Sequence, residues 1–158
     1  MADLLTHIDG QIYRAWQEER CPIVNGIFRP DDSVSRLTLE IDSVNRNFAT
    51  LKLMERTTLS AIERTSEVEW TYLTQLCEFK SITSHYVAIG GEGGFGSDGF
   101  VALLERDLRL LWLAFFDWSN PFTKVSVEDA VVTATSSLDA IWRFPVDAPE
   151  LVRVKEIK

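Results

Sequence analysis

A glycine cluster between positions 90 and 99 has the spacing of a phosphate-binding loop. Gly91, Gly93 and Gly96 match the pattern G-x-G-x-x-G directly after a predicted strand. In a dinucleotide-binding fold these glycines allow a tight turn, close approach of the backbone to a pyrophosphate and close packing of the next helix. Asp117, after the next apolar strand, is placed to accept a ribose hydroxyl. The cluster therefore suggests a nucleotide site.

The residues around these glycines argue against that site. Ser97, Asp98 and Gly99 occupy the first turns of the helix that should follow, and such residues favour turns. Asp117 lies 26 positions after Gly91, beyond the usual spacing of about 20. No lysine stands where a P-loop needs one. We therefore expect residues Gly90 to Gly99 to form a flexible loop. If this loop does bind a ligand, the protein would be a small nucleotide- or ligand-binding regulatory domain, which is the alternative function.

Other residue types that carry chemistry lack the partners that catalysis needs. Carboxylate pairs lie in polar stretches typical of solvated faces, namely Glu67 with Glu69, Glu105 with Asp107, and Glu128 with Asp129. His85 has no Asp, Cys or second His beside it, and the serines lack a G-x-S-x-G context. Cys21 and Cys77 are not in a metal-ligand spacing. We therefore expect no catalytic residue, no cofactor and no metal.

Hydrophobic spacing predicts a helix and a hairpin at the start of the chain. Apolar residues recur at near i, i+4, i+8 positions from residue 3 to residue 19, which is typical of an amphipathic helix. The Cys21-Pro22 step ends it. Apolar and polar residues then alternate over 37–41 and again over 48–53, as expected for the two strands of a hairpin.

A second helix is predicted over residues 67–79. Four apolar residues share one helical face there, namely Val68, Tyr72, Leu76 and Phe79. Ser66, with Glu69 three residues later, has the pattern of a capping box. Residues 59–65 are interpreted as the lead-in to this helix.

Short strands dominate the second half of the chain. Strands are expected over 86–89, 108–116, 122–127, 130–135, 142–144 and 151–157. Residues 100–105 fit either a strand paired with the next apolar run or a short helix. Helices early and strands late predict an α+β fold. We expect an antiparallel sheet of hairpins packed with one or two helices from the N-terminal half, in a single domain over residues 1–158.

Charge and hydropathy narrow the classes of partner. The net charge of −8 argues against nucleic acid and favours a basic protein, although such a charge also simply maintains solubility. The N-terminus lacks the pattern of a signal peptide, and the longest apolar run, residues 110–116, falls far short of a membrane span. We expect a cytoplasmic protein that does not associate with membranes. An exposed sheet edge would allow a homo-oligomer.

Four stretches of the second half carry a family resemblance. They are GGFGSDGF at 93–100, LWLAFFD at 111–117, SNPF at 119–122 and WRFP at 142–145. Together they resemble small bacterial immunity proteins of polymorphic and contact-dependent toxin systems. The resemblance implies a cytoplasmic protein that binds one cognate toxin domain and neutralises it, without cofactor or catalysis. Because the toxin-facing surfaces of such families vary, it assigns no binding residue.

Acidic residues are the expected contacts with a toxin. The first half of the chain is more acidic than the second, and an acidic surface would speed capture by a basic cleft. The expected toxin-binding residues are Glu63, Glu67, Glu69 and Glu78, with Glu92 and Asp98 of the glycine loop. Asp117 and Trp118, a carboxylate and an aromatic at a strand end, are a further expected anchor. The alternatives are solvated charge for the acids and burial for Trp118.

Overall fold

The residues that the structure describes fold mainly into antiparallel strands with two short α-helices. The computed structural model describes residues 10–41 and 48–156. The elements, in chain order, are α2 (Gln11–Gln17), β1 (Arg20–Pro22), β2 (Gly26–Phe28), β3 (Ser33–Ile41), β4 (Phe48–Thr58), α3 (Leu59–Thr65), β5 (Trp70–Tyr72), β6 (Thr74–Lys80), β7 (Tyr86–Glu92), β8 (Gly99–Glu105), β9 (Leu110–Phe116), β10 (Phe122–Glu128), β11 (Val131–Ser136), β12 (Ala140–Pro145), the 3₁₀ turn η1 (Pro149–Leu151) and β13 (Arg153–Glu156).

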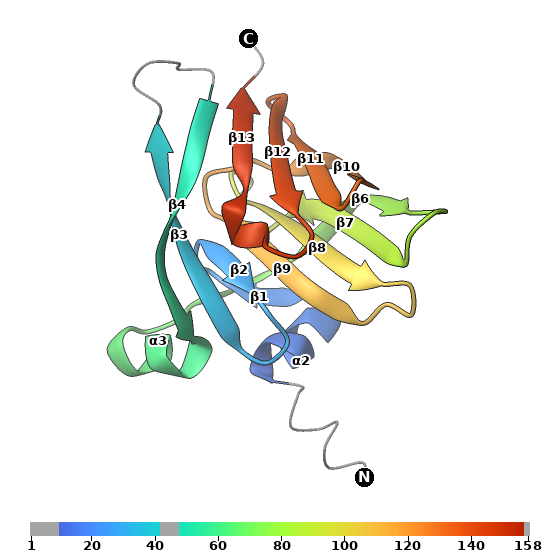
Figure 1. The fold of residues 1–158 in the computed structure, drawn as a ribbon. Helices are drawn as coiled ribbons and strands as arrows, with labels where there is room; N and C mark the ends of the chain where they lie inside the picture. Colours follow the sequence, from blue (N-terminus) through green and yellow to red (C-terminus); the bar gives the residue numbers. More distant parts are fainter. Residues whose placement is uncertain (1–9, 42–47, 157–158) are drawn as a thin grey trace.

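Eleven of these strands form one sheet in the order β10-β11-β12-β13-β4-β3-β2-β9-β8-β7-β6, and β1 pairs separately with β5. The sheet curls, so that its two end strands approach each other (Figure 1). The Cys77 thiol in β6 donates to the Phe122 carbonyl in β10 over 3.5 Å. A side chain at Gly90 in β7 would collide with Val125 of β10. The small residues of β6 and β7 thus let β10 pack against them.

The curled sheet has a hydrophobic core on each face of its central strands. One core fills the space between β2 and β7–β9 on one side and β10–β13 on the other, and includes Trp112, Phe116 and Trp142. The second core lies on the opposite face of the same central strands, where α2, α3, β1 and β5 cover Phe100 and Phe115. Central strands such as β9 are therefore apolar on both faces, which explains their continuous hydrophobic runs.

Side-chain caps fix where both helices begin. The Asp32 carboxylate accepts hydrogen bonds from the backbone N–H groups of Gln11 (2.9 Å) and Ile12 (2.8 Å) at the start of α2. Thr58 caps α3 by accepting from the N–H of Ala61 at 3.2 Å. Such caps satisfy N–H groups that have no partner within the helix. The helix predicted over 3–19 is confirmed for Gln11–Gln17, and its residues 3–9 lie outside the described residues.

Most predicted strands are confirmed. The hairpin over 37–41 and 48–53 is β3 paired with β4, and the strands predicted in the second half correspond to β7 and β9–β13. Residues 100–105 form β8, a strand paired with both β7 and β9, so the strand alternative was correct there. Residues 90–92, which were expected to belong to the glycine loop, continue β7.

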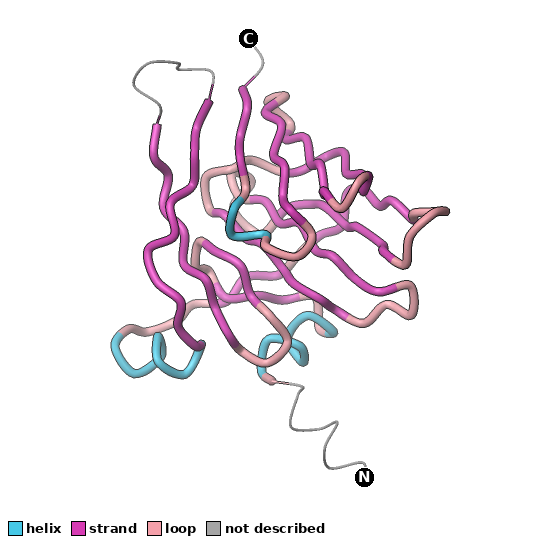
Figure 2. Tube along the Cα trace, in the orientation of Figure 1, coloured by secondary structure: helices cyan, strands magenta, loops and turns pink. Residues whose placement is uncertain are grey.

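The helix predicted over 67–79 is wrong. These residues form β5 and β6, which pair with β1 and β7, while only the lead-in at Leu59–Thr65 is helical. Tyr72 and Leu76, expected on a buried helical face, are exposed instead. The fold is sheet-rich, with 55% strand and 13% helix, and is thus more β-dominated than the predicted α+β class (Figure 2).

Candidate functional site

The glycine cluster connects two antiparallel strands. Gly91 lies within β7, where an added side chain would collide with the backbone carbonyl of Thr74 in β6. Gly99 begins β8, where an added side chain would collide with the carbonyl of Asn120. The loop itself is residues 93–98, and a strand rather than a helix follows it. Gly91 and Gly99 are therefore required by close packing of backbone within the protein.

The centre of this loop is occupied by the carboxylate of Asp98, which is completely buried. It accepts hydrogen bonds from the backbone N–H groups of Gly93 (2.9 Å) and Phe95 (3.4 Å). These are the groups that a phosphate-binding loop would direct at its ligand. Burial raises the pKa of the neighbouring Cys21 thiol well above its ordinary value, and the Asp98 charge adds to the effect. Asp98 was expected to face a toxin. This is corrected, because it has no exposed surface.

A hydrogen bond attaches the glycine loop to β5. The N–H of Gly94 donates to the Thr71 hydroxyl at 2.9 Å. Tyr72 follows Thr71 and is 72% exposed, while Phe95 follows Gly94 and is 63% exposed. The hydrogen bond thereby joins the two chain segments that carry these exposed aromatic side chains.

Acidic residues accompany these aromatics. Glu69 is exposed directly before β5, and Glu92 is half-buried at the end of β7, opposite Thr74. Neither forms an ion pair with any residue that the structure describes. We call Glu69, Tyr72, Glu92 and Phe95 the β5–loop surface. It contains two exposed aromatic side chains and two carboxylates that form no ion pair with a described residue.

The other acidic residues expected to contact a toxin are distributed over α3, the segment before β5, and β6. Glu67 is exposed two residues before Glu69, Glu63 is exposed on α3, and Glu78 is exposed on β6. Glu78 approaches Lys80 of the same strand at 3.9 Å. The acids of the first half are thus solvent-accessible, but Glu67 and Glu69 are the two nearest in sequence to the exposed Tyr72.

Asp117 and Trp118 lie in the turn between β9 and β10. The N–H of Asp117 donates to the Asn25 side chain at 2.8 Å, and its carbonyl accepts from the Ser97 hydroxyl at 3.2 Å. The Trp118 ring is half-buried, 5.4 Å from the ring of Trp142 and 6.0 Å from that of Phe116. These contacts favour packing as the role of Trp118, while the Asp117 side chain remains exposed.

A small hollow adjoins β5 on the side of α2. It has a volume of about 260 Å³ and is lined by Trp16, Gln17, Glu19, Leu73, Gln75, Ile89, Leu104 and Leu108. Leu73 follows Tyr72 in the chain, and Glu19 supplies the one carboxylate among the described lining residues. The hollow could accept an apolar or basic side chain of a partner that lies on β5 and β6.

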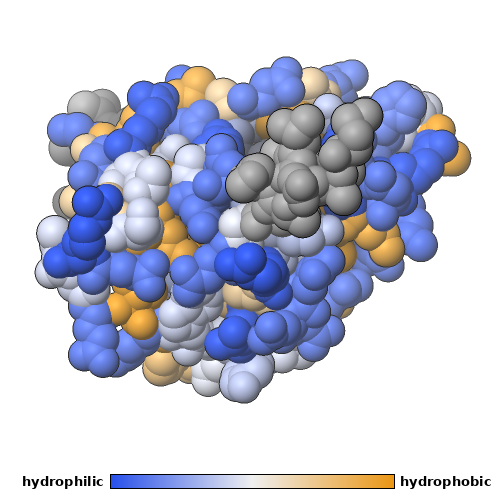
Figure 3. All heavy atoms as spheres, turned by 90° about the horizontal axis from the view of Figure 1, so that it is seen from below, coloured by the Kyte–Doolittle hydropathy of each residue, from blue (hydrophilic) through white to orange (hydrophobic). Residues whose placement is uncertain are grey.

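The face of the molecule that carries α2 and α3 is mostly hydrophilic, with separate small hydrophobic patches (Figure 3). None of the helices among the described residues is long and apolar enough to cross a membrane. Within residues 10–41 and 48–156 no group of three or more His, Cys, Asp or Glu residues is arranged to hold a metal ion.

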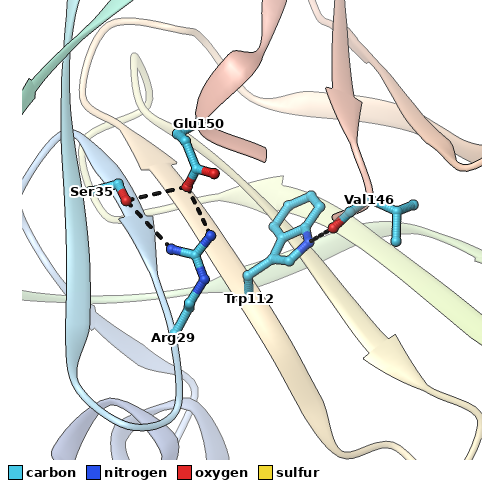
Figure 4. A network of polar contacts seen from close by, with 5 residues as sticks. All are labelled: Arg29, Ser35, Trp112, Val146 and Glu150. Carbon is cyan, nitrogen blue, oxygen red and sulfur yellow. Dashed lines mark hydrogen bonds and ion pairs between the residues drawn. The ribbon is translucent and has the colours of Figure 1, made fainter. Parts of the chain in front are cut away.

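A largely buried polar network connects η1 with β2 and β3 (Figure 4). The Glu150 carboxylate of η1 accepts from the Arg29 guanidinium at 2.8 Å and from the Ser35 hydroxyl at 3.2 Å. The Trp112 indole donates to the Val146 carbonyl at 3.0 Å. These bonds tie the connection between β12 and β13 to β2, β3 and β9. We assign the network a structural role, since each partner is satisfied within the protein.

Comparison with known proteins adds no relative. No family model, no curated protein and no solved structure matches the chain.

Tyr72 and Phe95 were missed as surface residues when the sequence was considered alone. Tyr72 was placed on the buried face of a helix, and Phe95 was treated as part of a loop motif. One signal was available for Phe95, because an aromatic flanked by Gly94 and Gly96 has little neighbouring side chain to pack against.

Proposed function

We propose that the protein is a non-enzymatic immunity protein that binds a cognate bacterial toxin domain and neutralises it in the cytoplasm. The β5–loop surface is the proposed contact. One observation carries this assignment: the Gly94–Thr71 hydrogen bond joins two segments that each carry a largely exposed aromatic side chain, Tyr72 and Phe95. The resemblance of the second half to immunity proteins supplies the class of partner.

Exposed aromatics of this kind favour a protein partner. Isolated apolar residues on a surface are ordinary, but aromatic residues held together beside polar groups are typical of interface hot spots. Tyrosine contributes a large contact area while losing little conformational freedom on binding. Here the loop that carries Phe95 is attached at both ends to strands and is fixed internally by Asp98. A rigid loop is less costly to bind than one that must become ordered.

The charge near the aromatics favours a basic toxin surface. Glu67, Glu69 and Glu92 form no ion pair with any described residue, and the net charge of the chain is −8. Complementary charge accelerates association and excludes acidic partners. These carboxylates, exposed in Glu67 and Glu69 and half-buried in Glu92, are thus proposed to steer the toxin, while Tyr72 and Phe95 supply most of the binding energy.

The alternative of a nucleotide-binding loop receives no support from the geometry. A phosphate would have to displace the buried Asp98 carboxylate from the N–H groups of Gly93 and Phe95. It would also bring negative charge next to that carboxylate, which is unfavourable at short range. We therefore do not propose this function.

Co-purification followed by a growth assay tests the proposal. The tagged chain is expressed in its source bacterium and bound proteins are identified. We expect one stoichiometric basic partner that arrests growth when expressed alone and is harmless when co-expressed with this chain. A partner whose toxicity is unchanged by co-expression, or the recovery of an enzyme substrate in place of a protein, would contradict the proposal.

A further inference from the structure

A groove of about 590 Å³ is lined by residues of β4, β11, β12, η1 and β13. Its lining includes Arg153, Val154 and Lys155, the three residues of β13 that pair with β4 among the described residues. Seven of its ten described lining residues are apolar, among them Val131, Ile141, Pro145 and Leu151. Its volume lies in the range of about 300–1,000 Å³ that is typical of small-molecule sites.

The remaining three lining residues are all cations, namely Arg143, Arg153 and Lys155, and none of the described residues lining the groove is acidic. This is unusual in a chain with 24 acidic and 16 basic residues. The cations come from two neighbouring strands, β12 and β13. The groove therefore combines an apolar wall with a local excess of positive charge.

The strand register makes that excess unfavourable for the protein alone. Arg143 of β12 is paired directly with Arg153 of β13. Like charges opposite each other in an antiparallel pair destabilise the sheet. Several other cations of the described chain have an acidic neighbour, as in Arg29–Glu150 and Arg36–Glu55, but Arg143 and Arg153 form no ion pair with a described residue. An anion between the two guanidinium groups would convert repulsion into attraction.

We infer that this groove binds a small amphipathic anion, a carboxylate with an apolar body. The carboxylate would lie between Arg143 and Arg153, since guanidinium groups recognise carboxylates through paired hydrogen bonds. The apolar body would cover Val131, Ile141 and Pro145, whose burial supplies the hydrophobic part of the affinity. The site lies on β11–β13, away from β5 and β6, so it does not depend on the proposed function.

Calorimetric titration with decanoate tests the inference, with decanol as a neutral probe of the same chain length. We expect decanoate to bind at least about tenfold more tightly than decanol, because only the acid can use the two arginines. The preference should decrease as salt is added, since the site is open to solvent. Equal binding of the two probes, or no binding of decanoate, would overturn the inference.

Paired variants assign the anion site to the two arginines. Arg143→Gln with Arg153→Gln should abolish the preference for decanoate over decanol. Arg56→Gln with Lys124→Gln is the matched control, because it removes the same charge from exposed positions outside the lining. A loss of preference in both double variants would overturn the assignment. Urea unfolding separates binding from folding, since removing the opposed charges should leave R143Q/R153Q at least as stable as the parent.

Discussion

The β5–loop surface and the β11–β13 groove are opposite in shape and in charge. At the first, Tyr72 and Phe95 project into solvent beside unpaired carboxylates. At the second, apolar side chains line a groove that also carries three cations, and none of its described lining residues is acidic. A protruding aromatic pair suits the surface of another protein, whereas a hollow suits a ligand that can be enclosed.

The same sheet builds both regions in different ways. The β5–loop surface depends on a loop held by the buried Asp98 and attached to β5. The groove depends on η1, which Glu150 attaches to β2 and β3. Each region therefore has its own polar support, and a change in one support should affect one region and spare the other.

Asp98→Ala should cause the largest loss of stability, about 2–3 kcal/mol, because it leaves buried N–H groups of the glycine loop without an acceptor. The loop should detach from β5, so partner binding should weaken while decanoate binding is unchanged. Urea unfolding and the two titrations measure these effects. A variant as stable as the parent would show that the Asp98 carboxylate does not hold the loop.

Glu150→Ala is the corresponding change beneath the groove. It leaves the Arg29 guanidinium without its carboxylate, and we expect a loss of about 1–2 kcal/mol, reduced because Arg29 is 30% exposed. Decanoate affinity should fall as η1 loosens, while partner affinity stays the same. Loss of partner binding without loss of decanoate binding would contradict the prediction that Glu150 supports the groove and not the β5–loop surface.

Glu67→Lys with Glu69→Lys sharpens the electrostatic side of the comparison. We expect association with a basic partner to slow several-fold and its salt dependence to flatten, with little change in dissociation, as for charges at an interface rim. Stopped-flow kinetics at two salt concentrations measures this. Glu128→Lys with Asp147→Lys is the charge-matched control, because both residues are exposed and outside the β5–loop surface. An unchanged on-rate in the Glu67 and Glu69 variant would remove these acids from the steering surface.

The smallest predicted effect is the contribution of the Cys21 thiol to the pH dependence of the free energy of unfolding. Burial raises the pKa of its thiol in the folded state, with a further contribution from Asp98, above the ordinary value of 9.0. The stabilisation is thus fully present below about pH 9.0 and declines at higher pH, where the unfolded chain loses the proton first. Urea unfolding at pH 7 and pH 10 should show a smaller alkaline loss for Cys21→Ala than for the parent.

Hydrophobic patterns predicted the strands that have one apolar and one polar face. They failed where the spacing of apolar residues fits a helix and a strand equally well. In β3 the alternation of apolar and polar residues identified the strand directly. Before and within β5 and β6, residues 68, 72 and 76 are spaced by four. This spacing fits one face of a helix and equally one face of a strand, because four is a multiple of two. These residues form strands because they pair with β1 and β7, whose residues the local pattern does not include.

The candidate sites were less predictable because their chemistry depends on long-range pairing. The glycine spacing that lets backbone approach a phosphate also lets one strand approach the backbone of another. Gly91 lies close to the Thr74 carbonyl in this way. Asp98 looked like a surface acid, but backbone N–H groups bind it, and these leave no mark in the sequence. The opposed arginines Arg143 and Arg153 become neighbours only through the register of β12 with β13.

The most direct test of the proposed contact is the affinity of the captured toxin for Tyr72→Ala with Phe95→Ala, measured by calorimetry. Ile82→Ala with Leu138→Ala is the matched control, because these residues are likewise apolar and exposed, at 94% and 69%. We expect the Tyr72 and Phe95 variant to lose at least about 100-fold in affinity, as for hot-spot residues, and the control to bind as the parent does. Equal affinity of the two double variants, with both folded, would contradict the assignment of toxin binding to the β5–loop surface.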